Sequence, residues 1–218
     1  MNPLSRLFGA AQPAGIDPVR WVVLDVETTG LDMEHDELLA IAAIAVRIDS
    51  GDGMSPRIDL ADSFEAVLHH ESPSTDKDNI LLHGIGVGAQ RAGVPPREVL
   101  DAFERWAGRS PLLAYHAAFD RVMIGRAMKT HLRRGLLPPW LDLAPVAAGL
   151  FPDVDAHALD DWLDHFGITC AVRHQAAADT LATAELLLRL WPRIRSQRVT
   201  QFAALQALAD QGRWLGLR

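Results

Sequence analysis

The sequence predicts an α/β domain built on a mixed five-stranded sheet, with an antiparallel meander of three strands and flanking helices. Three apolar stretches come first, separated only by short turns, and the later apolar stretches alternate with helical patterns. Apolar residues make up 49% of the chain and charged residues 22%, which is a globular balance. At 218 residues, the chain is long enough for one domain with short extensions.

The first three strands are predicted from apolar runs that end at turn residues. The run Arg20–Val26 is almost continuously apolar, which is the pattern of a strand covered on both faces. A turn at Thr29 and Gly30 leads into LLAIAAIAVRI (38–48), and a third strand is predicted near Ile58–Leu68. Because these strands follow one another through turns, they are expected to form the antiparallel meander.

The second half of the chain is predicted to alternate between helices and short strands. A polar loop and a glycine-containing turn over 81–89 separate it from the meander. The elements expected after that turn are a helix over Pro95–Trp106, a strand over 111–116, a helix over 119–135 ended by Gly135, a strand over Trp140–Leu143, helices over Ala158–Phe166 and Ala176–Trp191, the latter stopped by Pro192, and a tail helix over Thr200–Leu208.

The ends of the chain and its cysteine content bound its class. We divide the chain into an N-terminal arm (1–18), a main domain (19–195) and a C-terminal helical tail (196–218). The arm holds no apolar stretch long enough for a secretion signal. No apolar run reaches the ~20 residues that span a bilayer. The single cysteine cannot form an internal disulfide. We therefore expect a cytoplasmic protein with no membrane contact.

The charge balance argues against a protein that coats duplex DNA. The 21 basic and 28 acidic residues give a net charge of −7 with neutral histidines. Phosphate affinity depends on the number of cationic contacts, so a broad basic face is not expected. A nucleic-acid enzyme whose pocket gathers carboxylates around metal ions stays possible.

Five residues in three places are candidates for chemistry. Asp25 and Glu27 lie in an apolar strand, and their i, i+2 spacing puts both carboxylates on one face. Asp120 follows a strand and opens a helix. His174 and Asp179 are five residues apart, which on one helix would leave them about 140° apart, so His174 is expected in the loop before the helix that carries Asp179. Each place alone has an ordinary structural explanation.

Taken together, the four carboxylates indicate a metal site. Four like charges in one pocket would repel and raise one another's pKa values. Two divalent cations relieve this repulsion, and Mg²⁺ and Mn²⁺ prefer all-oxygen ligands of this kind. The four carboxylates therefore predict a site for two divalent cations.

The three places also resemble a known family. The segments LDVETTG, YHAAFD and HQAAAD are similar to the three motifs of the DEDD exonucleases, in the subclass with a histidine five residues before the last aspartate (DEDDh). The pattern looks like the proofreading (epsilon) subunits of bacterial DNA polymerase III and their stand-alone relatives, over Arg20 to Trp191. The resemblance implies a ribonuclease-H-like fold and 3′-to-5′ removal of nucleotides by two-metal hydrolysis.

The resemblance also implies roles for the candidate residues. Asp25 would bridge both metal ions, Glu27 and Asp179 would help to hold the nucleophile's ion, and Asp120 would hold the second ion. His174 would act as the general base, a role that suits a side chain that titrates near neutral pH.

A further set of residues is implied for the 3′ end of the substrate. Thr28 and Thr29 would meet the terminal nucleotide, with His83 and Ile85 near its base. Relatives usually carry His-Asn before the A-x-F-D stretch, whereas this chain has Tyr-His. We expect His116 either to take over the hydrogen bond of the missing asparagine or to approach the metal site.

Three functions therefore remain in view. The first is a metal-dependent 3′-to-5′ exonuclease acting on single-stranded DNA ends, with DNA polymerase as a possible partner. The second keeps the chemistry but acts on short or single-stranded RNA, because sugar choice depends on how the pocket treats the 2′-hydroxyl. The third is a non-catalytic module that binds a polymerase, against which the intact set of four acids and a histidine weighs.

Overall fold

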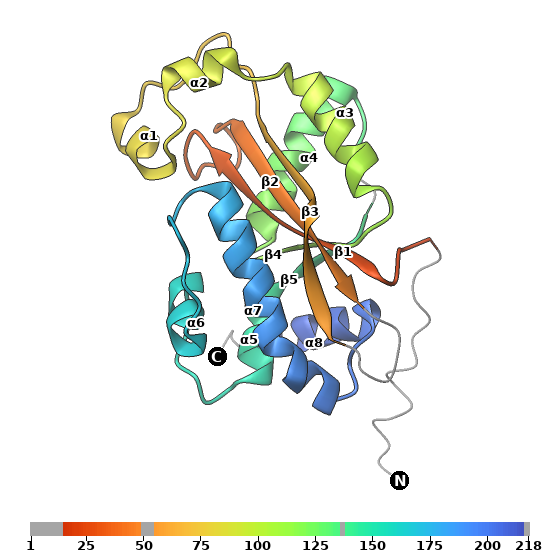
Figure 1. Cartoon of the computed structure of the whole chain (residues 1–218). Helices are drawn as coiled ribbons and strands as arrows, with labels where there is room; N and C mark the ends of the chain where they lie inside the picture. Colours follow the sequence, from red (N-terminus) through yellow and green to blue (C-terminus); the bar gives the residue numbers. More distant parts are fainter. Residues whose placement is uncertain (1–14, 49–54, 136–137, 216–218) are drawn as a thin grey trace.

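A five-stranded mixed sheet forms the centre of the molecule, as predicted (Figure 1). The computed structural model describes residues 15–48, 55–135 and 138–215, so most of the predicted arm lies outside the described residues. The spatial order of the strands is β3-β2-β1-β4-β5. The strands are β1 (Arg20–Thr28), β2 (Leu38–Ile48), β3 (Pro56–Val67), β4 (Leu112–Ala114) and β5 (Trp140–Asp142).

The pairing of the strands brings two chain segments to one edge of the sheet. Strands β1, β2 and β3 pair antiparallel, which confirms the meander. Strand β1 pairs parallel with β4, and β4 pairs parallel with β5. Because parallel strands end at the same edge of a sheet, the C-terminal half of β1 lies beside the residues that follow β4 and β5.

Helices cover both faces of the sheet (Figure 1). Trp21 and Val23 of β1 pack on the face covered by α5, α6, α7 and α8, whereas Val22 and Leu24 pack on the face covered by α3 and α4. The helices are α1 (Lys77–His83), α2 (Val87–Ala92), α3 (Pro96–Ala107), α4 (Ala118–Leu132), α5 (Leu143–Leu150), α6 (Leu159–Phe166), α7 (Ala176–Ser196) and α8 (Phe202–Leu215).

Three helices depart from the prediction between residues 77 and 150. The segment 81–89, predicted as a turn, contains the end of α1 and the start of α2. Helix α1 is capped by Asp76, whose side chain accepts hydrogen bonds from the amides of Asp78 and Asn79. Asp142, predicted within a strand that reaches Leu143, ends β5 and caps α5 by accepting from the Ala144 amide at 3.1 Å. Short helices such as these show too few turns to set up a clear apolar period.

The ends of three helices also differ from the prediction. Helix α4 ends at Leu132, three residues before Gly135, because Arg133 adopts a left-handed conformation with φ of 59°. Helix α7 continues through Pro192 to Ser196. The buried side chain of Ile194 anchors this last part of α7 in the core, which outweighs the one backbone hydrogen bond that proline cannot donate. The predicted tail helix starts at Phe202, packs against α5, and is longer than expected.

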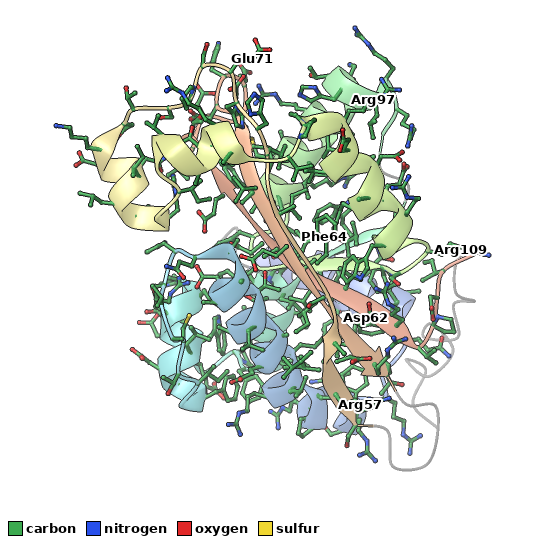
Figure 2. The ribbon with its side chains drawn as sticks, turned by 45° about the horizontal axis from the view of Figure 1, so that its top comes forward. Arg57, Asp62, Phe64, Glu71, Arg97 and Arg109 are labelled. Carbon is green, nitrogen blue, oxygen red and sulfur yellow. The ribbon has the colours of Figure 1, made fainter. Side chains whose placement is uncertain are left out.

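Ion pairs between side chains and contacts between aromatic rings stabilise the end of the sheet that lies away from the candidate acids. Asp62 on β3 accepts from Arg20 Nε and Nη2 at 2.7 and 2.8 Å, and from Arg47 Nη2 at 2.6 Å. The hydrogen bond from Arg20 holds the pKa of Asp62 below its usual value. Phe64 on the same strand packs on Phe103 of α3 with ring centroids 5.4 Å apart, and Figure 2 shows it turned toward that helix. These contacts fix the edge strand β3 against the domain.

Among the described residues, no helix has the length and apolar character needed to cross a membrane.

Candidate active site

Two of the predicted acids occupy the C-terminal end of β1. Side chains alternate along a strand, so Asp25 and Glu27 share the face of Trp21 and Val23, which is covered by α7. Both acids are only partly buried, because the core ends before this edge of the sheet. The amide of Ala176, the first residue of α7, donates a hydrogen bond to the Glu27 carboxylate.

The third predicted acid comes from the segment after β4. Asp120 lies in the first turn of α4 and is only 4% exposed. Its carboxylate accepts a hydrogen bond from the backbone amide of Val26, which sits between the two acids of β1. Burial raises the pKa of Asp120 to about 7, and the nearby Asp142 carboxylate raises it as well.

In the third motif, the residues before α7 contact the carboxylate of Asp179. Asp179 lies in the first turn of α7 and His174 in the preceding loop, as their spacing predicts. The backbone amide of His174 donates to Asp179 Oδ2 at 2.9 Å. Arg173 donates to Asp179 Oδ1 and also pairs with Asp160. The Sγ of Cys170 lies 3.5 Å from the same Oδ1. The His174 side chain remains exposed and its backbone φ is 60°.

The four acids form one electrostatic group. The pKa of Asp25 is raised well above its usual value. Burial is the largest cause, and the negative charges of Asp120, Glu27 and Asp179 raise this pKa further. Burial raises the pKa of Glu27 to about 8, and the Asp179 carboxylate adds to the effect. The Oε1 atom of Glu27 is buried and accepts no hydrogen bond from the described residues. A buried carboxylate oxygen without a partner is costly, so this atom marks a place where a cation fits.

The group is nevertheless not arranged as a finished set of metal ligands. Across the described parts of the chain, no three His, Cys, Asp or Glu side chains are placed to hold a metal ion as they stand. At Asp179, Oδ1 accepts from Arg173 and Oδ2 accepts from the His174 amide. The donor chemistry of the group, four carboxylates with one orphaned oxygen, is nevertheless the kind that Mg²⁺ and Mn²⁺ prefer.

The turn predicted to meet a nucleotide lies directly after Glu27. The β1–β2 pairing shifts register between Glu27 and Thr28, so the strand bends at this point. The Thr28 hydroxyl donates to the Gly30 carbonyl at 2.6 Å, and the Thr28 carbonyl accepts from Asn79 Nδ2 at 2.8 Å. Helix α1 is thereby attached to the end of β1. The sequence does not predict this contact of Asn79, because Asn79 and Thr28 are 51 positions apart.

The segment after α1 places His83 and Ile85 together. His83 is only 4% exposed, and its Nδ1 accepts a hydrogen bond from the Ile85 amide at 2.9 Å. Its Nε2 therefore carries the proton, and this atom is buried without a partner among the described residues. Burial lowers the pKa of His83, which favours the neutral ring. Buried Gln90 holds the segment by donating to the Ile85 carbonyl at 3.0 Å.

His116 lies on the Asp120 side of the site. It follows β4 in a left-handed conformation with φ of 58°, and its amide donates to Asp142 Oδ1 at 3.0 Å. Its exposed ring packs edge-on against Tyr115, with centroids 4.6 Å apart. The Asp142 carboxylate in turn neighbours Asp120. The structure thus brings His116 to the rim of the acidic group.

The raised pKa values predict how the ion-free protein responds to pH. A folded carboxyl with a raised pKa holds its proton at pH values where the unfolded chain has lost it, so the free energy of unfolding falls as pH rises from about 4 toward 8. Thermal unfolding in EDTA should show this loss, and Glu27→Gln should reduce it. Added Mg²⁺ should stabilise the protein more at pH 8 than at pH 5. Equal stabilisation by Mg²⁺ at both values would contradict the prediction.

The structure thus combines a five-stranded mixed sheet with four acids that gather at the end of β1, in the first turn of α4 and in the first turn of α7. The model of the exonuclease family (RNase_T) matches residues 22–187, which is most of the chain. The chain therefore belongs to the exonuclease family, and the resemblance to DEDDh exonucleases is confirmed.

Named relatives agree with this family. The DNA polymerase III subunit epsilon-like protein of Rhodobacter capsulatus is 31% identical over 193 residues, which cover 87% of this chain and 26% of that protein. The PolC-type DNA polymerase III of Bacillus subtilis is 31% identical over 171 residues, or 78% of this chain and 11% of the polymerase. The chain thus spans about a quarter of the first relative and a smaller share of the second.

Solved structures share the fold. E. coli exonuclease I in complex with a dT13 oligonucleotide superposes with a TM-score of 0.66 at 16% identity, covering 82% of this chain and 42% of exonuclease I. Cell-death related nuclease 4 (CRN-4) superposes with a TM-score of 0.65 at 15% identity, covering 82% of this chain and 64% of CRN-4. At these identities the superpositions confirm the predicted ribonuclease-H-like fold.

Proposed function

We propose that this protein is a divalent-metal-dependent 3′-to-5′ exonuclease that releases nucleoside monophosphates from single-stranded DNA ends. The strongest support is the group of four carboxylates, with three raised pKa values and one buried oxygen that lacks a partner. Such a group is costly in a fold unless cations or substrate-linked cations occupy it. Membership of the exonuclease family agrees with this chemistry.

The four acids would serve as ligands of two metal ions. Asp25, at the centre of the group, would bridge both ions, with Glu27 and Asp179 on one side and Asp120 on the other. When bound, two divalent cations supply charge stabilisation for the attacking and leaving oxygens of the phosphodiester. Arg173 contacts both Asp179 and Asp160, so a metal ion that displaced it from Asp179 would leave it beside Asp160 as a cation for a substrate phosphate.

His174 would move the proton. Its backbone amide anchors it to Asp179, while its imidazole is exposed and free of the carboxylate group. An exposed imidazole at the rim of the acidic group can face an attacking water and accept its proton.

The substrate's 3′ end would lie between the turn that follows β1 and the segment after α1. Thr28 and Thr29 approach it from the turn, and Ile85 offers an apolar contact for the base. The partnerless Nε2–H of His83 is a donor that a nucleotide acceptor would satisfy. His116, at the rim near Asp120, takes the place of the asparagine that relatives usually carry.

Single-stranded DNA is the substrate that the observations favour. The net charge of −7 leaves little cationic surface for a long duplex footprint. The structurally similar exonuclease I was solved with a dT13 oligonucleotide. The relatives named as subunits or types of DNA polymerase III make a polymerase a candidate partner. The cytoplasmic setting expected from the sequence is compatible with a DNA substrate and with a polymerase partner.

Nucleotide release with and without metal tests the proposal. Full-length protein should release mononucleotides from a single-stranded DNA oligonucleotide in Mg²⁺ or Mn²⁺, EDTA should abolish the release, and added Mg²⁺ should restore it. A matched blunt duplex should be digested more slowly, and an RNA of the same sequence tests sugar choice. Undiminished release in EDTA would overturn the metal-dependent chemistry, and faster digestion of the duplex would overturn the single-strand preference.

A further inference from the structure

The turn after β1 is closed by its own hydrogen bonds. Thr29 Oγ1 donates to Asp36 Oδ1 at 2.7 Å, and Asp36 Oδ2 accepts from the amide of Asp32 at 2.7 Å. The amide of Glu37 donates back to Thr29 Oγ1 at 2.9 Å. A Cβ at Gly30 would lie 2.5 Å from Asp36 Oδ2, so a larger residue there would push the Asp36 carboxylate away from these hydrogen bonds. Residues 29–37 therefore form one compact unit, which we call the β1 turn.

A single arginine attaches the β1 turn to helix α4. Arg126 Nη1 donates to the carbonyl of Met33 at 2.6 Å and to the carbonyl of Asp36 at 2.9 Å. Both bonds carry the charge of the guanidinium, which makes them stronger than bonds between neutral groups. Arg126 lies six residues after Asp120 on the same helix, a rise of about 9 Å. One rigid helix thus holds a proposed metal ligand at one end and the β1 turn further along.

We propose that Arg126 is a positioning residue for the 3′ end of the substrate. Its Nη1 hydrogen bonds go to the carbonyls of the β1 turn, so its role would be indirect. It holds the β1 turn at a set distance from Asp120, so that Thr28 and Thr29 are already in place when the terminal nucleotide enters. Binding is tighter when such a loop is ordered beforehand, because less conformational entropy is lost on association. This inference rests on the proposed function, since it requires the turn to meet the nucleotide.

The surroundings of Arg126 allow a clean substitution. Arg126 lines a cavity of about 440 Å³, whose lining also includes residues of α4, of the end of the β1 turn and of the segment 68–72 after β3. A methionine at this position can occupy similar space without overpacking, but it donates no hydrogen bond. Lysine keeps the charge on a single ammonium and lacks the planar guanidinium, so it replaces the two-carbonyl contact only in part.

The experiment compares Arg126→Met, Arg126→Lys and wild-type protein, with Lys129→Met as the control for losing one exposed charge on the same helix. Steady-state digestion of single-stranded dT10 in Mg²⁺ gives KM and kcat. Anisotropy of 5′-labelled dT10 in Ca²⁺ gives affinity. For Arg126→Met we expect KM and the dissociation constant to rise about tenfold, with kcat within about twofold of wild type. The KM and dissociation constant of Arg126→Lys should lie between those of Arg126→Met and wild type, and those of Lys129→Met should match wild type.

Two results would overturn the inference while leaving the proposed function intact. One is an Arg126→Met protein that melts at a lower temperature but keeps the wild-type KM and affinity, which would make Arg126 only a stabilising residue. The other is an effect confined to kcat, which would place Arg126 in the chemistry. A wild-type protein that neither digests nor binds dT10 would instead reject the proposed function, and this inference with it.

Discussion

Replacing Asp25 by asparagine is expected to lower nucleotide release by at least about 10³-fold, because a ligand shared by both ions, the role we propose for Asp25, would contribute several kcal/mol to stabilisation of the transition state. The same change should not unfold the protein. Burial and three neighbouring acids raise the pKa of Asp25, so removing its charge relieves repulsion in the ion-free state. The melting temperature in EDTA should therefore stay equal or rise, whereas the stabilisation by Mg²⁺ should be lost. Single-turnover kinetics and thermal unfolding with and without Mg²⁺ measure both effects.

The control for this substitution is Asp153→Asn, which removes an exposed acid outside the group. It should keep wild-type release and the wild-type response to Mg²⁺. Asp25→Asn protein that still gains full stability from Mg²⁺ would show that the ions bind elsewhere. A large loss of stability in EDTA would show instead that Asp25 has a structural role that charge repulsion does not describe.

Replacing His174 should separate proton transfer from metal binding. His174 adopts a φ of 60°, a conformation that costs asparagine less free energy than alanine, so His174→Asn is the better variant. Turnover should fall by roughly 10²–10⁴, the usual loss for a general base. Calorimetric Mn²⁺ affinity should stay near wild type, because the backbone amide at position 174, which holds Asp179, is kept.

His174→Ala provides the matched comparison. It should lose turnover to the same extent and, in addition, about 1 kcal/mol of stability from the left-handed backbone. Loss of Mn²⁺ affinity as severe as that of Asp25→Asn would make His174 a ligand. Wild-type turnover in both variants would make it a bystander.

Much of the sheet and the placement of the acids could be predicted because their signals are local. Alternation along Arg20–Val26 put Asp25 and Glu27 on one face, and the structure has that face under α7. The spacing of His174 and Asp179 placed one in a loop and the other in a first helical turn, as the structure has them. Such patterns need only the geometry of one element.

The contacts that complete the site could not be predicted, because they join distant parts of the chain. Arg126 holds carbonyls 93 and 90 residues away, and Asn79 holds one 51 residues away. A sequence pattern cannot predict which backbone carbonyl accepts a hydrogen bond from a distant side chain, because every residue type has a backbone carbonyl. The ion pair between Arg173 and Asp179 could not be predicted either, because the loop that carries Arg173 has no periodic pattern that fixes where its side chain points.

The products formed from a 5′-labelled oligonucleotide test the central claim most directly. Wild-type protein, 5′-fluorescein dT20 and Mg²⁺ should give a ladder that shortens one nucleotide at a time with the label retained in the longer products, and EDTA should leave the oligonucleotide intact. Early release of a labelled mononucleotide would mean digestion from the 5′ end, and early fragments of intermediate length would mean internal cleavage. Either pattern, or no digestion in Mg²⁺ or Mn²⁺, would contradict a metal-dependent 3′-to-5′ exonuclease.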